Sequence, residues 1–174
     1  MDPVPDPFSL DEVEMILEHM RGKYDPQVAN YFEFIFFTGL RIEEQIALYW
    51  SDVDWNKKYI RIQRAQTAGE LKSVKTGQIR DIDLNTRALE ALRRQKEHTF
   101  LQDKFIFLNP VTGNPWNDNG KAQRKNYWKP SLKKLGIRHR HAYNTRHTYA
   151  TMLLMANNKP PMQQNNWVTA WLYF

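Results

Sequence analysis

Along residues 1–50, hydrophobic side chains recur three or four positions apart, the spacing of one face of a helix. Ser9 and Glu12 have the spacing of a capping box, in which each side chain satisfies a backbone N–H at a helix start. The apolar positions that follow predict the first helix: Leu10, Val13, Ile16, Leu17 and Met20. A second helix is expected to start near Pro26 and to stop by Gly39, and a third to begin at about Arg41.

The spacing then changes from helical to alternating. Residues 55–58 read as a turn, and Tyr59, Ile60 and Ile62 predict a strand. Residues 79–84 alternate in the same way, with Thr76-Gly77 as a second turn before them. We therefore expect these two segments to pair as neighbouring strands.

Helical spacing returns in the second half of the chain. Asn85 is expected to cap a helix, and a basic helix from about Asn119 to Leu135 is expected to end at Gly136. Another helix starts near Asn144. The pattern predicts an α+β fold that is mainly helical, with a small antiparallel sheet in the middle.

Composition narrows the class of protein. The chain has 174 residues, of which 41% are hydrophobic, so it can bury a core. It contains no cysteine, which excludes disulfides, thiolate zinc sites and thiol catalysis. No apolar run approaches the ~20 residues of a membrane span. The acidic, proline-rich start is not a signal peptide, so we expect a cytosolic globular protein.

Charge is unevenly distributed along the sequence. Residues 1–50 carry ten acidic and three basic side chains, whereas no residue after Asp118 is acidic. That last third holds ten lysines and arginines, interleaved with aromatic residues. Such a distribution favours a polyanionic partner such as DNA or RNA, although a solvated basic helix face gives the same pattern.

Thr38–Glu44 is the first of three motifs that suggest chemistry. Its glycine allows a tight turn between helices, which points Arg41 outward at a helix start. Glu44 lies one turn later on the same face and can orient the guanidinium. The alternative is an ordinary surface Arg–Glu pair.

Lys75–Arg80 is the second motif. A lysine at the tip of a hairpin can reach into a phosphate-binding cleft as a point charge and proton donor. A solvated turn lysine is the alternative, and Lys72 nearby is a competing candidate.

Tyr143–Thr151 is the third motif. It places Arg146 in the first turn of a helix, after a run of basic residues. For Tyr143 and His147, the alternatives are a core aromatic residue and a buried, hydrogen-bonded histidine.

Together the three motifs resemble the catalytic domain of the tyrosine recombinases, the phage integrase family. That family has, in this order, a T-G-L-R-x-x-E box, a lysine on a β-hairpin and an H-x-x-R-H-T-x-A-T box. The resemblance covers about residues 8–156 and includes the Leu48-x-Trp50-x-Asp52 run after the first box. It implies the family's mainly helical catalytic fold.

The resemblance also implies roles for individual residues. Arg41 and Arg146 match the two arginines that hold the non-bridging oxygens of the scissile phosphate, where negative charge builds in the transition state. Glu44 matches the acidic residue that supports them. Lys75 matches the lysine that protonates the leaving 5′ oxygen.

One catalytic position departs from the family pattern. Tyr143 stands where the family most often has histidine. A tyrosine can donate a hydrogen bond to a phosphoryl oxygen, but its pKa near ~10 makes it a poor base. His141 is a possible substitute that breaks the spacing, and His147 matches a common structural position.

The family's chemistry uses a tyrosine nucleophile and a 3′-phosphotyrosyl intermediate. The phosphoester energy is stored in that bond, so neither a cofactor nor a metal is implied. The implied partners are a double-stranded DNA attachment site and other recombinase protomers. The implied location is the bacterial cytoplasm, on a prophage or mobile element.

After Ala156 the sequence departs from the family, which next shows an L-G-H phrase and a helix with the nucleophilic tyrosine. Residues 157–174 instead contain two tryptophan-bearing stretches without helical spacing. Read one frame over, their codons can spell Ala-Ala-Lys-Gln-Leu-Gly-His. We therefore interpret this segment as an aberrant tail, produced by a frameshift between about Ala156 and Pro161. Tyr173 is the only late tyrosine, and its surroundings do not resemble a nucleophile helix.

The predicted organisation has three parts: an extended lead-in at residues 1–8, an incomplete integrase-type catalytic domain at residues 9–156, and the tail at residues 157–174. The favoured hypothesis is a catalytic-domain fragment that binds DNA but is defective in strand transfer. The alternatives are a non-enzymatic basic DNA-binding fragment and an active recombinase that uses Tyr173.

Overall fold

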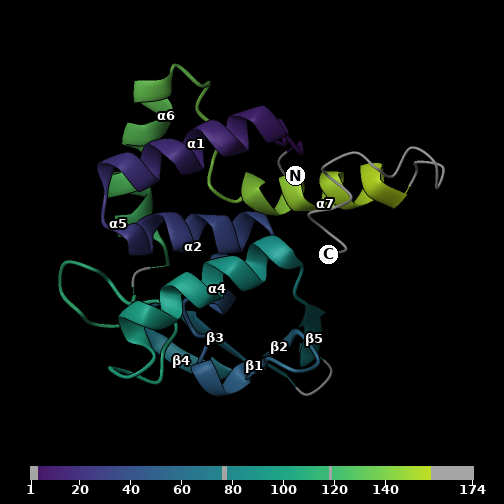
Figure 1. Ribbon diagram of the computed structural model, residues 1–174, viewed down its shortest axis with the longest axis vertical. Coiled ribbons are helices and arrows are strands. Elements are labelled where there is room, and N and C mark those ends of the chain that lie inside the picture. The colour runs from purple at the N-terminus through teal and green to yellow at the C-terminus, as the bar shows by residue number, and fades with distance from the viewer. Residues whose placement is uncertain (1–3, 76–77, 118, 158–174) are drawn as a thin grey trace.

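The computed structural model describes residues 4–75, 78–117 and 119–157 (Figure 1). The helical elements are α1 (Leu10–Lys23), α2 (Pro26–Phe36), α3 (Ile42–Gln45), the 3₁₀ turn η1 (Trp50–Asp52), α4 (Thr86–Thr99), α5 (Lys121–Gln123), the π-helical turn η3 (Arg124–Trp128), α6 (Lys129–Leu135) and α7 (Asn144–Asn157). The strands are β1 (Val53–Asp54), β2 (Tyr59–Ile62), β3 (Arg64–Thr67), β4 (Glu70–Ser73) and β5 (Arg80–Asp83). The predicted α+β, mainly helical class is confirmed.

Capping side chains start three of the long helices. Ser9 and Glu12 form the predicted capping box at α1. The side chain of Asp25 accepts a hydrogen bond at the start of α2, where Pro26 occupies the first turn, and Asn85 caps α4 as predicted. The sequence signals for helix starts were therefore reliable.

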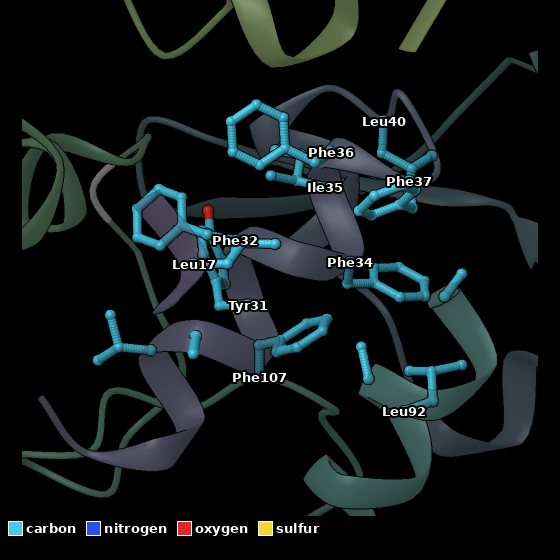
Figure 2. Close-up of a cluster of buried hydrophobic side chains, with 14 of the residues drawn as sticks. Leu17, Tyr31, Phe32, Phe34, Ile35, Phe36, Phe37, Leu40, Leu92 and Phe107 are labelled. Carbon is cyan, nitrogen blue, oxygen red and sulfur yellow. The ribbon is translucent and has the colours of Figure 1, made fainter. Parts of the chain in front are cut away.

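The central helix of the fold is α2, which lies between α1 and α4 in Figure 1 and also contacts α7. All its residues from Val28 to Phe36 are buried. Figure 2 shows its aromatic side chains pointing in several directions into the core, with Phe34 toward α4 and Phe107. On another side, Phe32 stacks on the fully buried ring of Trp128. One helix therefore organises the hydrophobic core, which lies on both sides of it.

A buried carboxylate joins α2 to α4. The Glu33 side chain is 2% exposed, and it accepts hydrogen bonds from Arg87 at 2.7 Å, Arg21 at 3.2 Å and Arg94. A charge removed from water needs such partners, since an unpaired one would cost several kcal/mol, on the order of 3–5. This ion-pair network is one link that fixes α4 against the central helix.

The sheet region has two parts. Strands β1, β2 and β5 form a three-stranded antiparallel sheet, in which Ile60 lies opposite Ile82. The predicted pairing of residues 59–62 with residues 79–84 is thus confirmed. Between β2 and β5 along the chain, β3 and β4 form a separate hairpin that the sequence pattern did not predict. All four residues of β4 are exposed, so this strand lacks the apolar alternation that would have indicated it.

The extra hairpin corrects the expected place of Lys75. The tip of the β3–β4 hairpin is formed by Ala68 and Gly69, both with positive φ. Lys75 instead follows β4, on the way to β5. The expectation that it occupies a hairpin tip was wrong, because the chain makes an additional pair of strands before it reaches that lysine. The expected turn at Thr76-Gly77 lies outside the described residues.

The end of the lead-in docks against the domain. Phe8 is 5% exposed and packs edge-on against Phe36 and Trp128, with ring centroids 6.0 and 5.4 Å away. Its backbone N–H donates a 2.9 Å hydrogen bond to the hydroxyl of Thr148 in α7. This segment therefore ties the first and last described helices together.

We predict that Phe8→Ala lowers the free energy of unfolding by about 3 kcal/mol, because it removes a buried ring and leaves a cavity beside Trp128. Urea denaturation followed by tryptophan fluorescence measures this. Val4→Ala, in the same segment but at a residue 86% exposed, is the matched control and should change stability by less than about 0.5 kcal/mol. Equal effects of the two variants would contradict the docking.

Candidate active site

The first motif forms the turn between α2 and α3. Gly39 has a φ of +65°, a conformation that favours glycine, and the chain reverses there toward Arg41. Arg41 precedes α3, and its backbone N–H donates to Glu44 Oε2 at 3.1 Å, while its guanidinium lies 3.5 Å from Glu44 Oε1. The predicted Arg41–Glu44 pair is present. The Arg41 side chain is 51% exposed, so the guanidinium keeps a face toward solvent.

A second arginine completes the coordination of Glu44. Arg80, at the start of β5, donates from both terminal nitrogens to the two carboxylate oxygens, each at 2.9 Å. Burial alone would raise the pKa of Glu44. The hydrogen bonds from Arg80 and from the Arg41 backbone, together with both positive charges, outweigh burial and hold that pKa below its ordinary value of 4.5. Glu44 is therefore ionised at neutral pH.

Sequence reasoning gave Arg80 no role. It lies in the same motif as Lys75 and opens the alternating strand, but 36 positions separate it from Glu44. Only the packing of β5 against the α2–α3 turn brings the two together. The available signal was a charged residue at the first position of a half-buried strand, which is too common to be diagnostic.

The third motif meets the first through direct contact of α7 with the turn. Arg146 donates from Nη1 to the carbonyl oxygen of Gly39 at 2.7 Å. A Cβ atom on Gly39 would lie only 2.4 Å from Cδ1 of Tyr149 in α7. Glycine is therefore required both by the backbone conformation and by the close approach of this helix.

The result is a positively charged open cleft. Two arginines, Arg80 and Arg146, and part of the α2–α3 turn line it. The full set of lining residues is Thr38, Gly39, Arg80, Ile82, Arg146, Tyr149, Ala150 and Leu153. Arg41 is linked to this lining indirectly, because it shares the Glu44 carboxylate with Arg80. Guanidinium groups held by fixed partners are well suited to bind the oxygens of a phosphate group.

Tyr143 and His147 lie at the start of α7. Their rings pack edge-on, with centroids 5.3 Å apart, and Tyr143 is 39% exposed. The backbone N–H of Arg146 donates to the carbonyl oxygen of Tyr143 at 3.1 Å. His141 Nδ1 accepts a 3.2 Å hydrogen bond from the Tyr143 backbone N–H. Tyr143 and His147 thus lie within one helical turn of Arg146 along the chain, and His141 lies five positions before it.

The two candidate lysines differ in their surroundings. Lys72, in β4, forms an exposed ion pair with Glu70 at 2.8 Å. Lys75 is exposed, and its carbonyl oxygen accepts a hydrogen bond from the Gln78 backbone N–H at 2.7 Å. The pairing of Lys72 favours Lys75 as the lysine available to a ligand. Tyr173 and the rest of the tail after Asn157 lie outside the described residues.

Within residues 4–75, 78–117 and 119–157, no three histidine, cysteine or acidic side chains are placed to hold a metal ion. In that same part of the chain, no helix has the length and apolar character to cross a membrane.

Several known proteins are similar in sequence to this chain. The model of the Phage integrase family matches residues 8–164, a range that continues past Ala156. The prophage integrase IntR of Escherichia coli is 33% identical over 186 residues, covering 90% of this chain and 42% of IntR. The putative defective protein IntQ of the same organism is 28% identical over 195 residues, covering 93% of this chain and 46% of IntQ. The chain spans less than half the length of these curated relatives.

Solved structures show the same fold. The Tn1549 transposon integrase in complex with a circular intermediate DNA has a TM-score of 0.75 at 18% identity, covering 99% of this chain and 60% of that one. XerA recombinase has a TM-score of 0.69 at 20% identity, with coverages of 98% and 56%. A lambda integrase tetramer bound to a Holliday junction has a TM-score of 0.62 at 17% identity, with coverages of 99% and 48%.

We predict that Glu44→Gln lowers the free energy of unfolding by about 2 kcal/mol at neutral pH, because two guanidinium groups lose their shared carboxylate. The folded-state pKa of Glu44 is depressed, so its stabilisation is present above its ordinary value of 4.5 and is lost as the pH falls through the folded-state pKa. The difference between variant and parent should therefore shrink in acid. Denaturation curves across this range measure it.

The matched control is Glu43→Gln, at the neighbouring, partly exposed residue. It should leave stability nearly unchanged at every pH. A loss for Glu44→Gln that stays constant in acid, or an equal loss for the control, would contradict the assignment.

Proposed function

The chain belongs to the phage integrase family, and from this premise we propose that residues 9–156 are an integrase-type catalytic domain that binds the phosphate backbone of double-stranded DNA. The proposal makes this chain the phosphate-binding part of a site-specific recombinase. Its target is a DNA attachment site, its further partners are other recombinase protomers, and its location is the bacterial cytoplasm.

The observation that carries the proposal is the linked set of arginines around Glu44. Arg41 and Arg80 share the Glu44 carboxylate, and Arg146 is fixed to the carbonyl of Gly39 in the same turn. Three guanidinium groups and one carboxylate leave two positive charges uncompensated. A phosphodiester carries one negative charge and its pentacovalent transition state carries two, so this cleft favours the transition state over the ground state.

We assign roles within this cleft as follows. Arg41 and Arg146 bind the non-bridging oxygens of the scissile phosphate. Glu44 positions Arg41, and Arg80 neutralises Glu44 so that its carboxylate does not repel the phosphate. The bidentate contact of Arg80 is geometry that a lysine would not supply.

We assign proton transfer and alignment of the phosphate to the remaining candidate residues. Lys75 protonates the leaving 5′ oxygen, which is consistent with its exposed position beyond β4. Tyr143 donates a hydrogen bond to a phosphoryl oxygen. His147 supports the Tyr143 ring through their edge-on contact. His141 is the alternative to Tyr143.

We further propose that residues 157–174 are defective as the nucleophile-bearing region of strand transfer. Family chemistry requires a tyrosine nucleophile, and the sequence from Asn157 to Phe174 contains neither the L-G-H phrase nor a helical pattern around Tyr173. Residues 157–174 then replace the region that bears the nucleophile.

We predict that Arg41→Ala and Arg146→Ala each weaken binding to duplex DNA by about tenfold at moderate salt, because each removes a charged hydrogen bond to phosphate. Each should also reduce the slope of log affinity against log salt by about one. Fluorescence anisotropy with a labelled duplex measures both quantities. Arg93→Ala, at an exposed arginine of α4, is the matched control.

Because Arg146 also contacts Gly39, the unfolding transition of each variant is measured beside its affinity, and Arg146→Lys tests whether charge alone suffices. Loss of affinity in Arg93→Ala equal to that in Arg41→Ala would overturn the assignment of the cleft.

We predict that a nicked suicide duplex, which traps a covalent intermediate, yields no protein–DNA adduct with this chain although the duplex binds. Denaturing electrophoresis after incubation detects an adduct as a band of lower mobility. An adduct that disappears in Tyr173→Phe would make the chain an active recombinase with that nucleophile and would contradict the proposed defect.

A further inference from the structure

The end of the lead-in, residues 4–8, is joined to α7 by two backbone hydrogen bonds (Figure 1). The N–H of Asp6 donates to Asn144 Oδ1 at 3.2 Å. The N–H of Phe8 donates to Thr148 Oγ1 at 2.9 Å, and that hydroxyl donates onward to the carbonyl oxygen of Asn144 at 2.7 Å. Thr148 is 0% exposed. Its hydroxyl therefore acts as donor and acceptor inside the protein, between the lead-in and the first turn of α7.

The spacing of the two contacts fits both chain conformations. Pro7 separates Asp6 from Phe8, and a residue that precedes a proline favours extended backbone. Two residues of an extended chain advance about 6–7 Å. The helical turn from Asn144 to Thr148 advances about 6 Å. The lead-in is thus in register with one turn of α7, and Pro7, which has no N–H, adds no donor between the two contacts.

These contacts lie on the face of α7 opposite the open cleft lined by Arg80 and Arg146, which we call the arginine cleft. The α7 residues that line it share one helix face, with spacings of three and four: Arg146, Tyr149, Ala150 and Leu153. Asn144 and Thr148 are each two positions from Arg146, which is about 200° around a helix. The lead-in therefore holds α7 from behind, while the bond from Arg146 to the Gly39 carbonyl holds it in front.

The lead-in has anchors of its own besides its bonds to α7. The Asp6 carboxylate accepts two hydrogen bonds from Arg138, at 2.6 and 2.8 Å, and one from Arg140 at 3.2 Å. The Arg140 guanidinium lies 4.4 Å from the centroid of the Phe8 ring. That ring packs edge-on against the fully buried Trp128. The lead-in is therefore fixed to the core independently, so it can serve as a reference for the position of α7.

We propose that Asn144 and Thr148 are positioning residues, through which the lead-in sets the place of Arg146 in the arginine cleft. Thr148 has the larger effect, because its buried hydroxyl makes two of the three hydrogen bonds involved. Without that hydroxyl, α7 can shift against the α2–α3 turn, and Arg146 loses the fixed geometry that phosphate binding needs. The inference rests on the proposed function, because the position of Arg146 is measured through duplex binding.

The first test replaces the Thr148 hydroxyl. Thr148→Val keeps the branched shape but removes both hydrogen bonds, and it should weaken binding to a labelled duplex about fivefold. Thr148→Ser keeps the hydroxyl and should bind within about twofold of the parent. Fluorescence anisotropy measures affinity at a temperature at which the unfolding curve of each variant shows it to be folded. Where Thr148→Val does not fold, Asn144→Ala removes only the acceptor for Asp6 and should weaken binding about two- to threefold.

A double-mutant cycle separates positioning from general destabilisation. If Thr148 acts through Arg146, Thr148→Val should add less than about twofold to the loss caused by Arg146→Ala. The same change should keep its full factor of about five in the Arg41→Ala background. A merely structural role would give equal factors in the two backgrounds and would overturn the inference.

The matched control is Thr99→Val in α4. Thr99 is also buried, and its hydroxyl donates to the carbonyl oxygen of Ile106 at 2.7 Å, away from the residues that line the cleft. This variant should lose stability but keep the parent's affinity. Parental affinity in Thr148→Val, or an equal loss in Thr99→Val, overturns the positioning role while leaving the arginine cleft intact. Absence of duplex binding by the parent, or unchanged affinity in Arg146→Ala, instead overturns the proposed function.

Discussion

A buried carboxylate needs positively charged partners to replace its hydration. Two buried glutamates, Glu33 and Glu44, have this requirement, and their partners link several elements of the domain. Glu33 draws arginines of α1 and α4 onto the central helix, and Glu44 draws β5 onto the turn that follows it. Both networks span elements distant in sequence. They differ in their surroundings: the partners of Glu33 include the largely buried Arg87, whereas Arg80, a partner of Glu44, lines the open cleft beside Arg146. The same physical rule thus produces a structural joint in one place and the arginine-lined wall of an open cleft in the other.

The cleft also depends on the absence of a side chain at Gly39. Arg146 can bind the carbonyl of Gly39 only because α7 lies directly against the turn, with the ring of Tyr149 in the space that a Cβ would fill. Two motifs more than 100 positions apart in the sequence are joined by this contact. A glycine between two helices therefore sets the distance between cationic groups that neither helix could set alone.

Elements with a local signature were predictable from the sequence. Caps and helical spacing placed α1, α2, α4 and α7, and the alternation of apolar residues placed β2 and β5. The β3–β4 hairpin escaped prediction because its outer strand buries nothing. The role of Arg80 was not predicted because its partner, Glu44, is 36 positions away in sequence and lies beside it only in the folded structure. The basic C-terminal third was correctly identified, but its charge count did not reveal that Arg138 and Arg140 are already paired with Asp6 and Glu12.

Strand β4, whose four residues are all exposed, opens at a lower free energy than the core of the domain. Separating β4 from β3 breaks one ladder of hydrogen bonds and exposes no core, so it costs far less than global unfolding. Its amide hydrogens should exchange with solvent well before those of α2. Lys75 follows this weakly held strand, whereas Arg41 and Arg146 are anchored next to the core. In the proposed assignment, phosphate binding and proton donation therefore belong to different cooperative units, so the arginines stay fixed while the segment that carries Lys75 opens and closes.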